Sequence, residues 1–485
     1  MPPSLALFLW LVVLVMLLRY DPARRPDTSP GLWIPVLWVS IVASRLPSQW
    51  LGVRQMAAQA YDEGNSLDRI IYSVLIVMAI GVLMSRSVKW RDVLARHIAV
   101  VGVLLFALFS VVWSDFPLVA FKRWFRDLGL YLGILIVWSD PRPLEAVRTV
   151  LRRLCFLLIP LSIVLYKYYP DTGRQYDLWT GQPSYVGATT SKNMLGLLCL
   201  TSGLFFVWDT MTRWRDRSEP RAQRILLVNV AFIGMTIWLL TLAHSATSSA
   251  CLTLGCVVLA AAHGKGGSRR LALFMLPVPV AICLYAVLSL GFGVDLGATF
   301  APVLGRDATL TGRTQIWNTL IAMQTSPLVG AGYESFWMGS RLQRVWASDA
   351  GMINEAHNGY LQVYLNLGAM GLLLLFGVLI GTYWRIWKGL RAFPAIGSFG
   401  LALWTVLVVY NVTEAAFLGG VLWTALLMMM GPLEGHGGQQ QPAAAKAPGH
   451  SKWRHLKPRV AAVSVTSLSS RPSTPMLLSA RRRKL

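Results

Sequence analysis

Charged residues and cysteines are both scarce in this chain of 485 residues. Only 14% of the residues are Asp, Glu, Lys or Arg, whereas 55% are hydrophobic, which excludes the composition of an ordinary soluble domain. The five cysteines, Cys155, Cys199, Cys251, Cys256 and Cys283, all fall in apolar stretches. Such an odd, buried set predicts neither a disulfide framework nor a metal site. The sequence also lacks a hydrolase triad, a zinc cluster and a phosphate-binding Gly-Lys loop, so ATP chemistry has no support.

The rest of the sequence consists mainly of long apolar runs. Several reach the ~20 residues that a helix needs to cross ~30 Å of hydrocarbon. We therefore predict an all-α fold, a polytopic membrane helix bundle of about 12 to 13 transmembrane helices. The predicted spans are 4–18, 32–43, 70–84, 98–113, 127–138, 154–168, 193–208, 225–243, 249–262, 271–293, 361–383, 399–410 and 415–430.

Basic residues orient these spans. Arg and Lys cluster in alternate loops, for example at 19–25, 86–96, 142–153, 213–224 and 385–391, and short basic loops stay on the cytoplasmic side. The predicted topology therefore has the N-terminus outside and the C-terminus inside. The formal net charge of +23 indicates topology and contact with anionic membrane lipids, and not binding to nucleic acid.

Two regions interrupt the alternation of spans and short loops. Residues 432–485 are rich in Gly, Gln, Pro, Ala and Ser and end in "ARRRKL", which predicts a disordered, basic cytoplasmic tail. Residues 294–360 form by far the longest external loop and contain several aromatic residues and helix signals. An ordered long loop on a membrane scaffold commonly carries function. We predict that residues 1–431 form the transmembrane domain and that this loop is its catalytic part.

Arg313 is the first candidate within the loop. "TLTGRTQIWNTLIAMQTSP" predicts an amphipathic helix with Thr311 as its N-cap. Arg313 then lies in the first turn, where the helix dipole disfavours a cation but where a bound anion would meet both free backbone N–H groups and a guanidinium. The alternative is an arginine that extends toward lipid phosphate.

His357 is the second candidate, in "EAHNGYLQVYLNLG". On a helix it shares a face with Tyr360, at the mouth of a membrane span. A neutral imidazole there can accept a proton from a hydroxyl group, as a general base does. The alternative is an interfacial histidine that only caps the helix and forms hydrogen bonds.

The remaining candidates are polar residues near the outer surface. Lys192 in "TSKN" and Arg174 could help to bind an anion, with Lys122, Arg123 and Arg126 ranked behind them; a role as interfacial anchors is the alternative. Glu414 interrupts the apolar run after Phe399. An acid at membrane depth is costly and indicates function, but the chain could instead turn there, which would make Glu414 a loop residue.

The motifs of this region resemble a known family. "LGRDATLTGRTQIW", "SPLVGAGYESFW" and "AHNGYLQVYLNLGAMG" are similar to the O-antigen ligase and polymerase superfamily of bacterial envelope enzymes, most of all to its exopolysaccharide polymerase branch. "GATTSKNMLG" and "LTLAHSATSSACLTLG" resemble further motifs of that branch. The resemblance spans roughly residues 185–371. A second arginine that ligases tend to carry after the eighth span is absent; Ser245, Thr247 and Ser248 stand there.

The resemblance implies an enzyme of the bacterial inner membrane. It would be an inverting glycosyltransferase without metal, ATP or other cofactor, with an undecaprenyl diphosphate-linked glycan as donor. Arg313 would bind the diphosphate and His357 would activate the acceptor hydroxyl. Asn358, which would support the turn, and Tyr360 join Lys192, Arg174 and Glu414 as substrate-binding candidates.

Three functions stay open at this point. A polymerase would join glycan repeats, a ligase would transfer the glycan to lipid A core, and a flippase or transporter would move precursors. A transporter, however, would place its distinctive polar residues near the membrane midplane.

Overall fold

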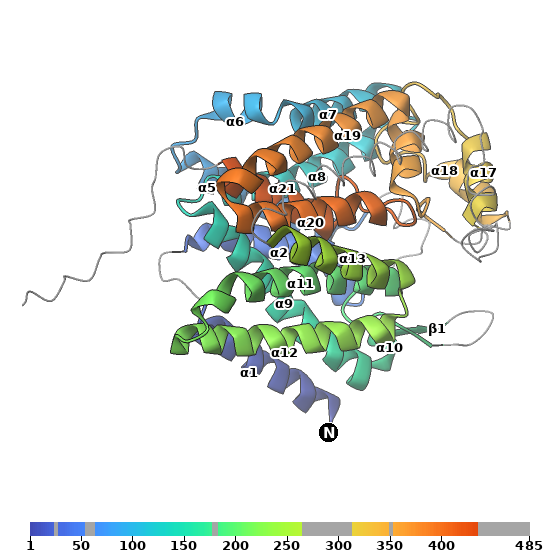
Figure 1. Ribbon diagram of the computed structural model, residues 1–485. Helices are drawn as coiled ribbons and strands as arrows, with labels where there is room; N and C mark the ends of the chain where they lie inside the picture. Colours follow the sequence, from blue (N-terminus) through green and yellow to red (C-terminus); the bar gives the residue numbers. More distant parts are fainter. Residues whose placement is uncertain (24–27, 54–63, 177–182, 264–312, 349–352, 435–485) are drawn as a thin grey trace, which may run out of the picture. The chain divides into compact units, whose positions relative to one another are not determined.

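The computed structural model describes residues 1–23, 28–53, 64–176, 183–263, 313–348 and 353–434. These residues are almost entirely helical, which confirms the predicted all-α polytopic fold (Figure 1). The helices are α1 (Pro3–Tyr20), α2 (Trp33–Val42), α3 (Pro47–Trp50), α5 (Ser66–Met84), α6 (Trp90–Arg96), α7 (Ile98–Phe109), α8 (Pro117–Trp138), α9 (Pro143–Tyr168), α10 (Pro170–Gly173), α11 (Lys192–Arg213), α12 (Pro220–Ala243), α13 (Ala246–His263), α17 (Arg313–Ala322), α18 (Gly339–Trp346), α19 (Gly359–Ala392), α20 (Pro394–Tyr410) and α21 (Val421–Glu434). Two short antiparallel strands, β1 (Arg174–Tyr176) and β2 (Pro183–Tyr185), form a hairpin.

Six of the described helices are long and apolar enough to cross a membrane, or seven if α6 and the bent segment Ile98–Trp113 form one span. Four shorter apolar helices accompany them: Pro30–Val42, Ala246–Ala262, Pro394–Tyr410 and Val421–Leu433. The number of full-length spans is thus smaller than the predicted count. The predicted span 271–293 and the predicted tail 432–485 lie outside the described residues, except for the first three residues of the tail, which end α21.

Local sequence signals explain where many helices begin. Proline occupies the first position of α8, α9, α12 and α20, where the missing N–H group costs nothing and the fixed φ suits a helix. The side chains of Asn65, Ser191 and Asn358 cap α5, α11 and α19 by accepting hydrogen bonds from backbone N–H groups. Such caps satisfy donors that the first turn leaves without a partner.

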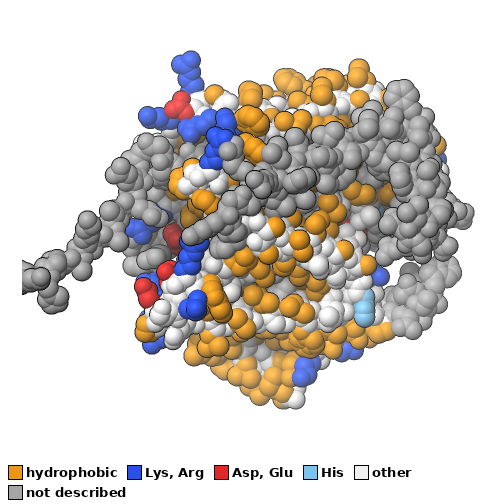
Figure 2. Space-filling view, viewed as in Figure 1, with side chains coloured by type: hydrophobic (Ala, Val, Ile, Leu, Met, Phe, Trp, Pro, Cys, Tyr) orange, Lys and Arg blue, Asp and Glu red, His pale blue; other side chains and the backbone are white. Residues whose placement is uncertain are grey.

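The outer surface of the bundle is apolar. Leu227, Val77 and Ile380 are 72%, 69% and 69% exposed, and Figure 2 shows apolar side chains over much of the visible face. Lys and Arg side chains gather mainly at the end where α6 lies and α12 begins (Figures 1 and 2), whereas α17 and α18 lie at the other end. This distribution is typical of a bundle surrounded by lipid.

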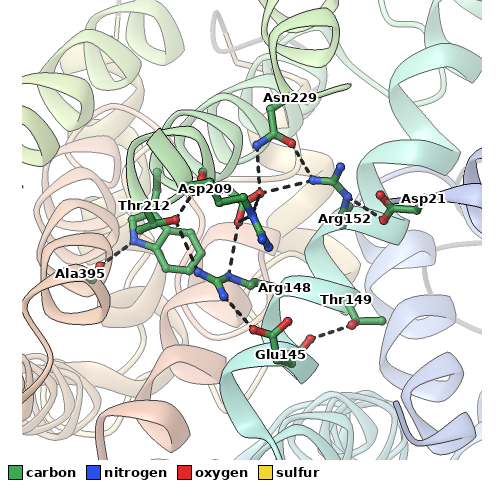
Figure 3. A network of polar contacts seen from close by, with 11 residues as sticks. Asp21, Glu145, Arg148, Thr149, Arg152, Asp209, Thr212, Asn229 and Ala395 are labelled. Carbon is green, nitrogen blue, oxygen red and sulfur yellow. Dashed lines mark hydrogen bonds and ion pairs between the residues drawn. The ribbon is translucent and has the colours of Figure 1, made fainter. Parts of the chain in front are cut away.

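A buried polar network joins three helices at the basic end (Figure 3). Asp209 on α11, 1% exposed, lies 3.0 Å from Arg213 Nε, 3.4 Å from Arg148 Nε and 3.5 Å from Arg152 Nη1. Asn229 on α12 donates to the same carboxylate at 2.9 Å. Because buried charges are stable only when paired and hydrogen-bonded, the network fixes α9, α11 and α12 relative to one another. It lies about 24 Å along α11 from the first turn of that helix.

The long helix α19 is broken at Gly368, where φ is 64° and ψ is −165°. The segment before α18 fills the break: Ala331 and Gly332 donate to the carbonyls of Leu365 and Asn366, while Ala369 donates to Pro327. These bonds satisfy backbone groups that a broken helix would otherwise leave unpaired. The part of the predicted external loop that follows α17 is therefore integrated with the bundle.

Candidate active site

Four segments that are distant in the sequence meet where α11 begins. Asn193, in the first turn of α11, donates its amide N–H group to both carboxylate oxygens of Glu414, at 3.1 Å each. The hydroxyl groups of Thr247 and Thr413 are 3.0 Å apart, which brings in the turn between α12 and α13. Gly359 at the start of α19 donates to the Asn411 carbonyl at 2.8 Å. The motifs "TSKN", "HSATSS", "EAHNGY" and "NVTEAAF" thus form one cluster.

His357 lies in this cluster between two acids. Its Nδ1 atom is 3.1 Å from Glu355 Oε1 and 3.5 Å from Glu414 Oε2. Neither oxygen is aligned with the ring N–H direction, so Nδ1 lacks a linear hydrogen bond. The contacts are therefore chiefly electrostatic. The His357 side chain is 24% exposed, Glu355 40% and Glu414 5%.

The two acids change the protonation state that the sequence predicted for His357. The Glu355 carboxylate, and after it the Glu414 carboxylate, raises the pKa of His357 to about 9, whereas burial of the ring opposes the shift. A raised pKa favours the protonated ring at pH 7, in contrast to the neutral imidazole that the sequence led us to expect. The two neighbouring carboxylates stabilise this proton.

The backbone around His357 is strained and held from several directions. His357 has a φ of 46°, in the left-handed region that non-glycine residues seldom adopt. It lies two residues before α19 and not on the helix, contrary to the sequence prediction. Asn358 accepts hydrogen bonds from the N–H groups of Tyr360 and Leu361, so its side chain caps the first turn of α19. Trp317 on α17 donates its indole N–H to the Ala356 carbonyl at 2.8 Å.

Glu414 belongs to the turn between α20 and α21. The structure therefore separates the predicted spans 399–410 and 415–430, and of the two alternatives it favours the loop acid. Glu414 is nevertheless buried and bound by Asn193, so the cost of burying a carboxylate is offset by hydrogen bonds and by His357.

The other predicted site residues are less closely associated with the cluster. Lys192 is exposed at the start of α11, next to Asn193. Arg174 donates to the Tyr166 carbonyl at 3.1 Å and lies over the rings of Tyr166 and Tyr185, as expected for the anchoring alternative.

Tyr360 is 3% exposed and donates its hydroxyl group to the Val408 carbonyl. This places it in the packed core beneath the cluster. Arg313 begins α17, one helical turn before Trp317; its side chain lies outside the described part of the chain.

A cavity of about 300 Å³ opens beside the cluster. Its walls include Glu355 and Asn354 from the segment before α19, Gln362 from the first turn of α19, Phe417 from the turn after α20, and Glu334. This volume is at the lower limit of the ~300–1,000 Å³ typical of ligand sites. We call it the Glu355 cavity.

The side chains of Glu355, His357 and Glu414 have the spacing of metal ligands. One ligand atom from each of Glu355, His357 and Glu414 lies within 4.8 Å of the other two. A metal ion would bind the neutral ring, so it would compete with the proton on His357. The prediction of a site without metal therefore needs a direct test.

Residues 185–376 match the O-Antigen ligase family model. A curated relative, the exopolysaccharide production protein ExoQ of Rhizobium meliloti (strain 1021), is 28% identical over 312 residues, which are 61% of this chain and 67% of that protein. The predicted resemblance to this superfamily and to its exopolysaccharide branch is therefore confirmed. The matched segment contains Asn193, Glu355 and His357, whereas Glu414 lies beyond it.

Two members of the cluster were not predicted from the sequence. Asn193 is the residue after Lys192, and Glu355 precedes His357 by two positions. Asn193 stands inside a motif that carried the resemblance, and Glu355 directly precedes another. The Glu355 carboxylate and the Asn193 amide are the polar groups nearest in sequence to His357 and Lys192. The directions of these two side chains, however, depend on the tertiary contacts of two helix N-termini.

Proposed function

We propose that this protein is a glycosyltransferase that joins lipid diphosphate-linked oligosaccharides on the outer side of the bacterial inner membrane. The observation that carries the proposal is the Asn193–Glu414–His357–Glu355 cluster, whose Glu355 lines a cavity and whose members except Glu414 lie in a segment similar to O-antigen ligases. The similarity to a protein of exopolysaccharide production favours a polymerase.

In the proposed reaction an acceptor hydroxyl oxygen attacks the anomeric carbon of the donor sugar. The bond from that carbon to the diphosphate breaks, the undecaprenyl diphosphate leaves with the electron pair, and the configuration inverts. The hydroxyl proton passes to His357 once its ring is neutral. Glu414 and Glu355 hold the imidazole and favour the imidazolium that forms, because they stabilise its positive charge.

The leaving diphosphate gains negative charge in the transition state, which a fixed cation would stabilise. Arg313 is the proposed cation, because α17 is tied through Trp317 to the residue before His357. Removal of one such donor typically costs ~10²–10³ in kcat, and that is the loss we expect for Arg313→Ala. Lys192, exposed at the edge of the cluster, is proposed as a second contact for the donor.

The proposed orientation places this cluster outside and the Asp209 network inside, with the N-terminus out and the C-terminus in. The clustering of Lys and Arg at the network end (Figure 2) supports it. Basic loops at that end would contact anionic lipids. Labelling of single cysteines with a reagent that does not cross membranes tests the orientation: a cysteine at position 192 should react in intact cells, and one at position 217 should not.

Reconstitution with defined lipid-linked repeats tests the function. Growth of a ladder of products supports a polymerase, and product that forms only on added lipid A core supports the ligase alternative. Arg313→Ala and His357→Ala should abolish joining while lipid-linked units remain accessible outside. If those units stayed inside in the variants, a transporter would be the better description.

A further inference from the structure

A second cavity of about 360 Å³ adjoins the Glu355 cavity. The two share the residues Tyr333, Glu334, Phe417, Leu418 and Gly419 as a common wall. The second cavity extends from this wall between α2, α3, α5 and α8 to the residues around the start of α11. We call it the Asp127 cavity. Two cavities that meet at one wall suit a reaction with two large substrates better than a hydrolysis with one.

An ion pair on α8 lies in the wall of the Asp127 cavity. Arg126 Nε and Nη2 lie 2.8 and 3.1 Å from the two oxygens of Asp127, and Tyr333 donates its hydroxyl group to the same carboxylate at 2.9 Å. Both residues line the cavity, and the Arg126 side chain is 39% exposed. The pair can therefore contact a ligand that enters the cavity.

The rest of the lining is polar but balanced in charge. Arg45 and Arg126 are matched by Asp127 and Glu334, and Ser44, Gln49 and Thr190 add uncharged groups. Trp38 and Tyr72 contribute rings with centroids 4.8 Å apart. Planar carboxylate, guanidinium and amide groups form paired hydrogen bonds, and aromatic rings pack against apolar ring faces. This combination recognises a sugar, with its many hydroxyl groups, and gives a phosphate group no net attraction.

Glu334 connects the two cavities. Its φ is 52°, in the left-handed region that non-glycine residues seldom adopt, and its carbonyl accepts a hydrogen bond from Arg123 at 2.5 Å. Burial raises the pKa of the Glu334 carboxyl group; the Arg123 guanidinium opposes this shift and the Asp127 carboxylate adds to it. Gly419, which also lines both cavities, has open space where a Cβ would stand. A ligand that extended from one cavity into the other would therefore contact both Glu334 and Gly419.

We propose that the Asp127 cavity binds sugar residues of the acceptor glycan, whose reacting hydroxyl group reaches the His357 cluster across the wall at Glu334 and Gly419. This inference rests on the proposed function. The donor glycan would occupy the Glu355 cavity, and the acceptor would be recognised chiefly by Arg126, Asp127 and Gln49.

Kinetics with each substrate varied in turn test the assignment. The probe is an oligosaccharide released by mild acid from the lipid-linked repeats of the host cell, used as acceptor with the lipid-linked repeat as donor. Asp127→Asn should raise the KM for the acceptor at least tenfold, the loss expected for a hydrogen bond to a charged group. Gln49→Ala, at an exposed rim position, should raise it about threefold to tenfold. The KM for the donor should remain within about twofold of the wild-type value.

Asp171→Asn is the matched control, because Asp171 is exposed in α10 and lines neither cavity. A raised donor KM with an unchanged acceptor KM in both variants would overturn the assignment, as would unchanged KM values for both substrates. The change in melting temperature that the oligosaccharide induces in the full-length protein separates the proposed sugar site from the proposed glycosyltransferase function. If wild type joins no glycan, a shift that Gln49→Ala abolishes still supports the sugar site, whereas no shift in wild type rejects it.

Discussion

Glu414→Gln tests how the cluster sets the protonation of His357. The substitution keeps the shape of the side chain and an oxygen for the Asn193 amide, but it removes a charge 3.5 Å from His357 Nδ1. Glu355 and Glu414 together raise the pKa of His357 from 6.5 to about 9. Loss of the more distant carboxylate should lower it by about one unit, equivalent to about 1.4 kcal/mol.

The sign of the effect follows from the proposed base. Only the neutral ring accepts a proton, so the rate of glycan joining should rise with pH in the wild type and level off above about 9. In Glu414→Gln it should level off about one unit lower, because the neutral fraction at a given pH is about tenfold larger. Initial rates from pH 6 to 10 in liposomes, with both substrates saturating, measure this. Glu219→Gln, an exposed acid before α12, is the control.

If Glu414→Gln leaves the midpoint of the pH–rate profile unchanged, the Glu414 carboxylate does not set the pKa of the group that titrates. A wild-type rate that falls as pH rises toward 9 would refute the base role in a different way. In that case the imidazolium would be the active form, and His357 would be a cation for the leaving diphosphate.

Three further predictions concern the contacts that position the cluster and those that hold the helices of the bundle together. Trp317→Phe removes the hydrogen bond to the Ala356 carbonyl and should lower kcat several-fold, consistent with about 0.5–1.5 kcal/mol, with little change in melting temperature. Gly368→Ala should lower the melting temperature in detergent, since its φ is 64° and a Cβ would stand 2.3 Å from the Leu328 carbonyl carbon; Gly81→Ala, with open space around it, should not. Asp209→Ala should destabilise the protein by about 3–5 kcal/mol in denaturant unfolding, because the buried Arg152 and the partly buried Arg148 and Arg213 lose their shared partner.

Metal removal provides a separate test of the three clustered side chains. If the cluster works by proton transfer alone, incubation with EDTA should leave the rate of glycan joining unchanged. A rate lost with EDTA and restored by one divalent cation would assign Glu355, His357 and Glu414 as its ligands.

Features encoded locally were predictable from the sequence. Apolar runs predicted the membrane bundle, proline and Asn358 mark helix starts, and the basic loops are at one end as expected. The span predicted at 127–138 shows the limit of this reasoning. The helix α8 begins at Pro117, ten residues earlier, and its first half carries Arg123, Arg126 and Asp127, whose partners are the Glu334 carbonyl, one another and Tyr333. A hydropathy window does not register such tertiary contacts.

The site was only partly predictable, because its chemistry depends on contacts between distant residues. His357 was identified, but its protonation state depends on Glu414, and the Asn193–Glu414 hydrogen bond joins residues 221 positions apart. The left-handed backbone at Glu334 and His357 was equally hidden, because neither residue favours that conformation alone. The packed segments around Glu334 and His357 stabilise this strained backbone conformation.

The position of the cluster explains why strain and buried charge persist there. Asn193 and His357 both lie at helix starts, in α11 and just before α19, so the positive end of each helix dipole points toward Glu414 and Glu355. The same dipoles would attract a diphosphate at this end of the bundle. An arriving anion would compete with the two carboxylates for the proton on His357 and for Asn193. If the proposed function holds, binding of the donor would be coupled to the protonation of His357, and the pH at which the rate levels off should change with donor concentration.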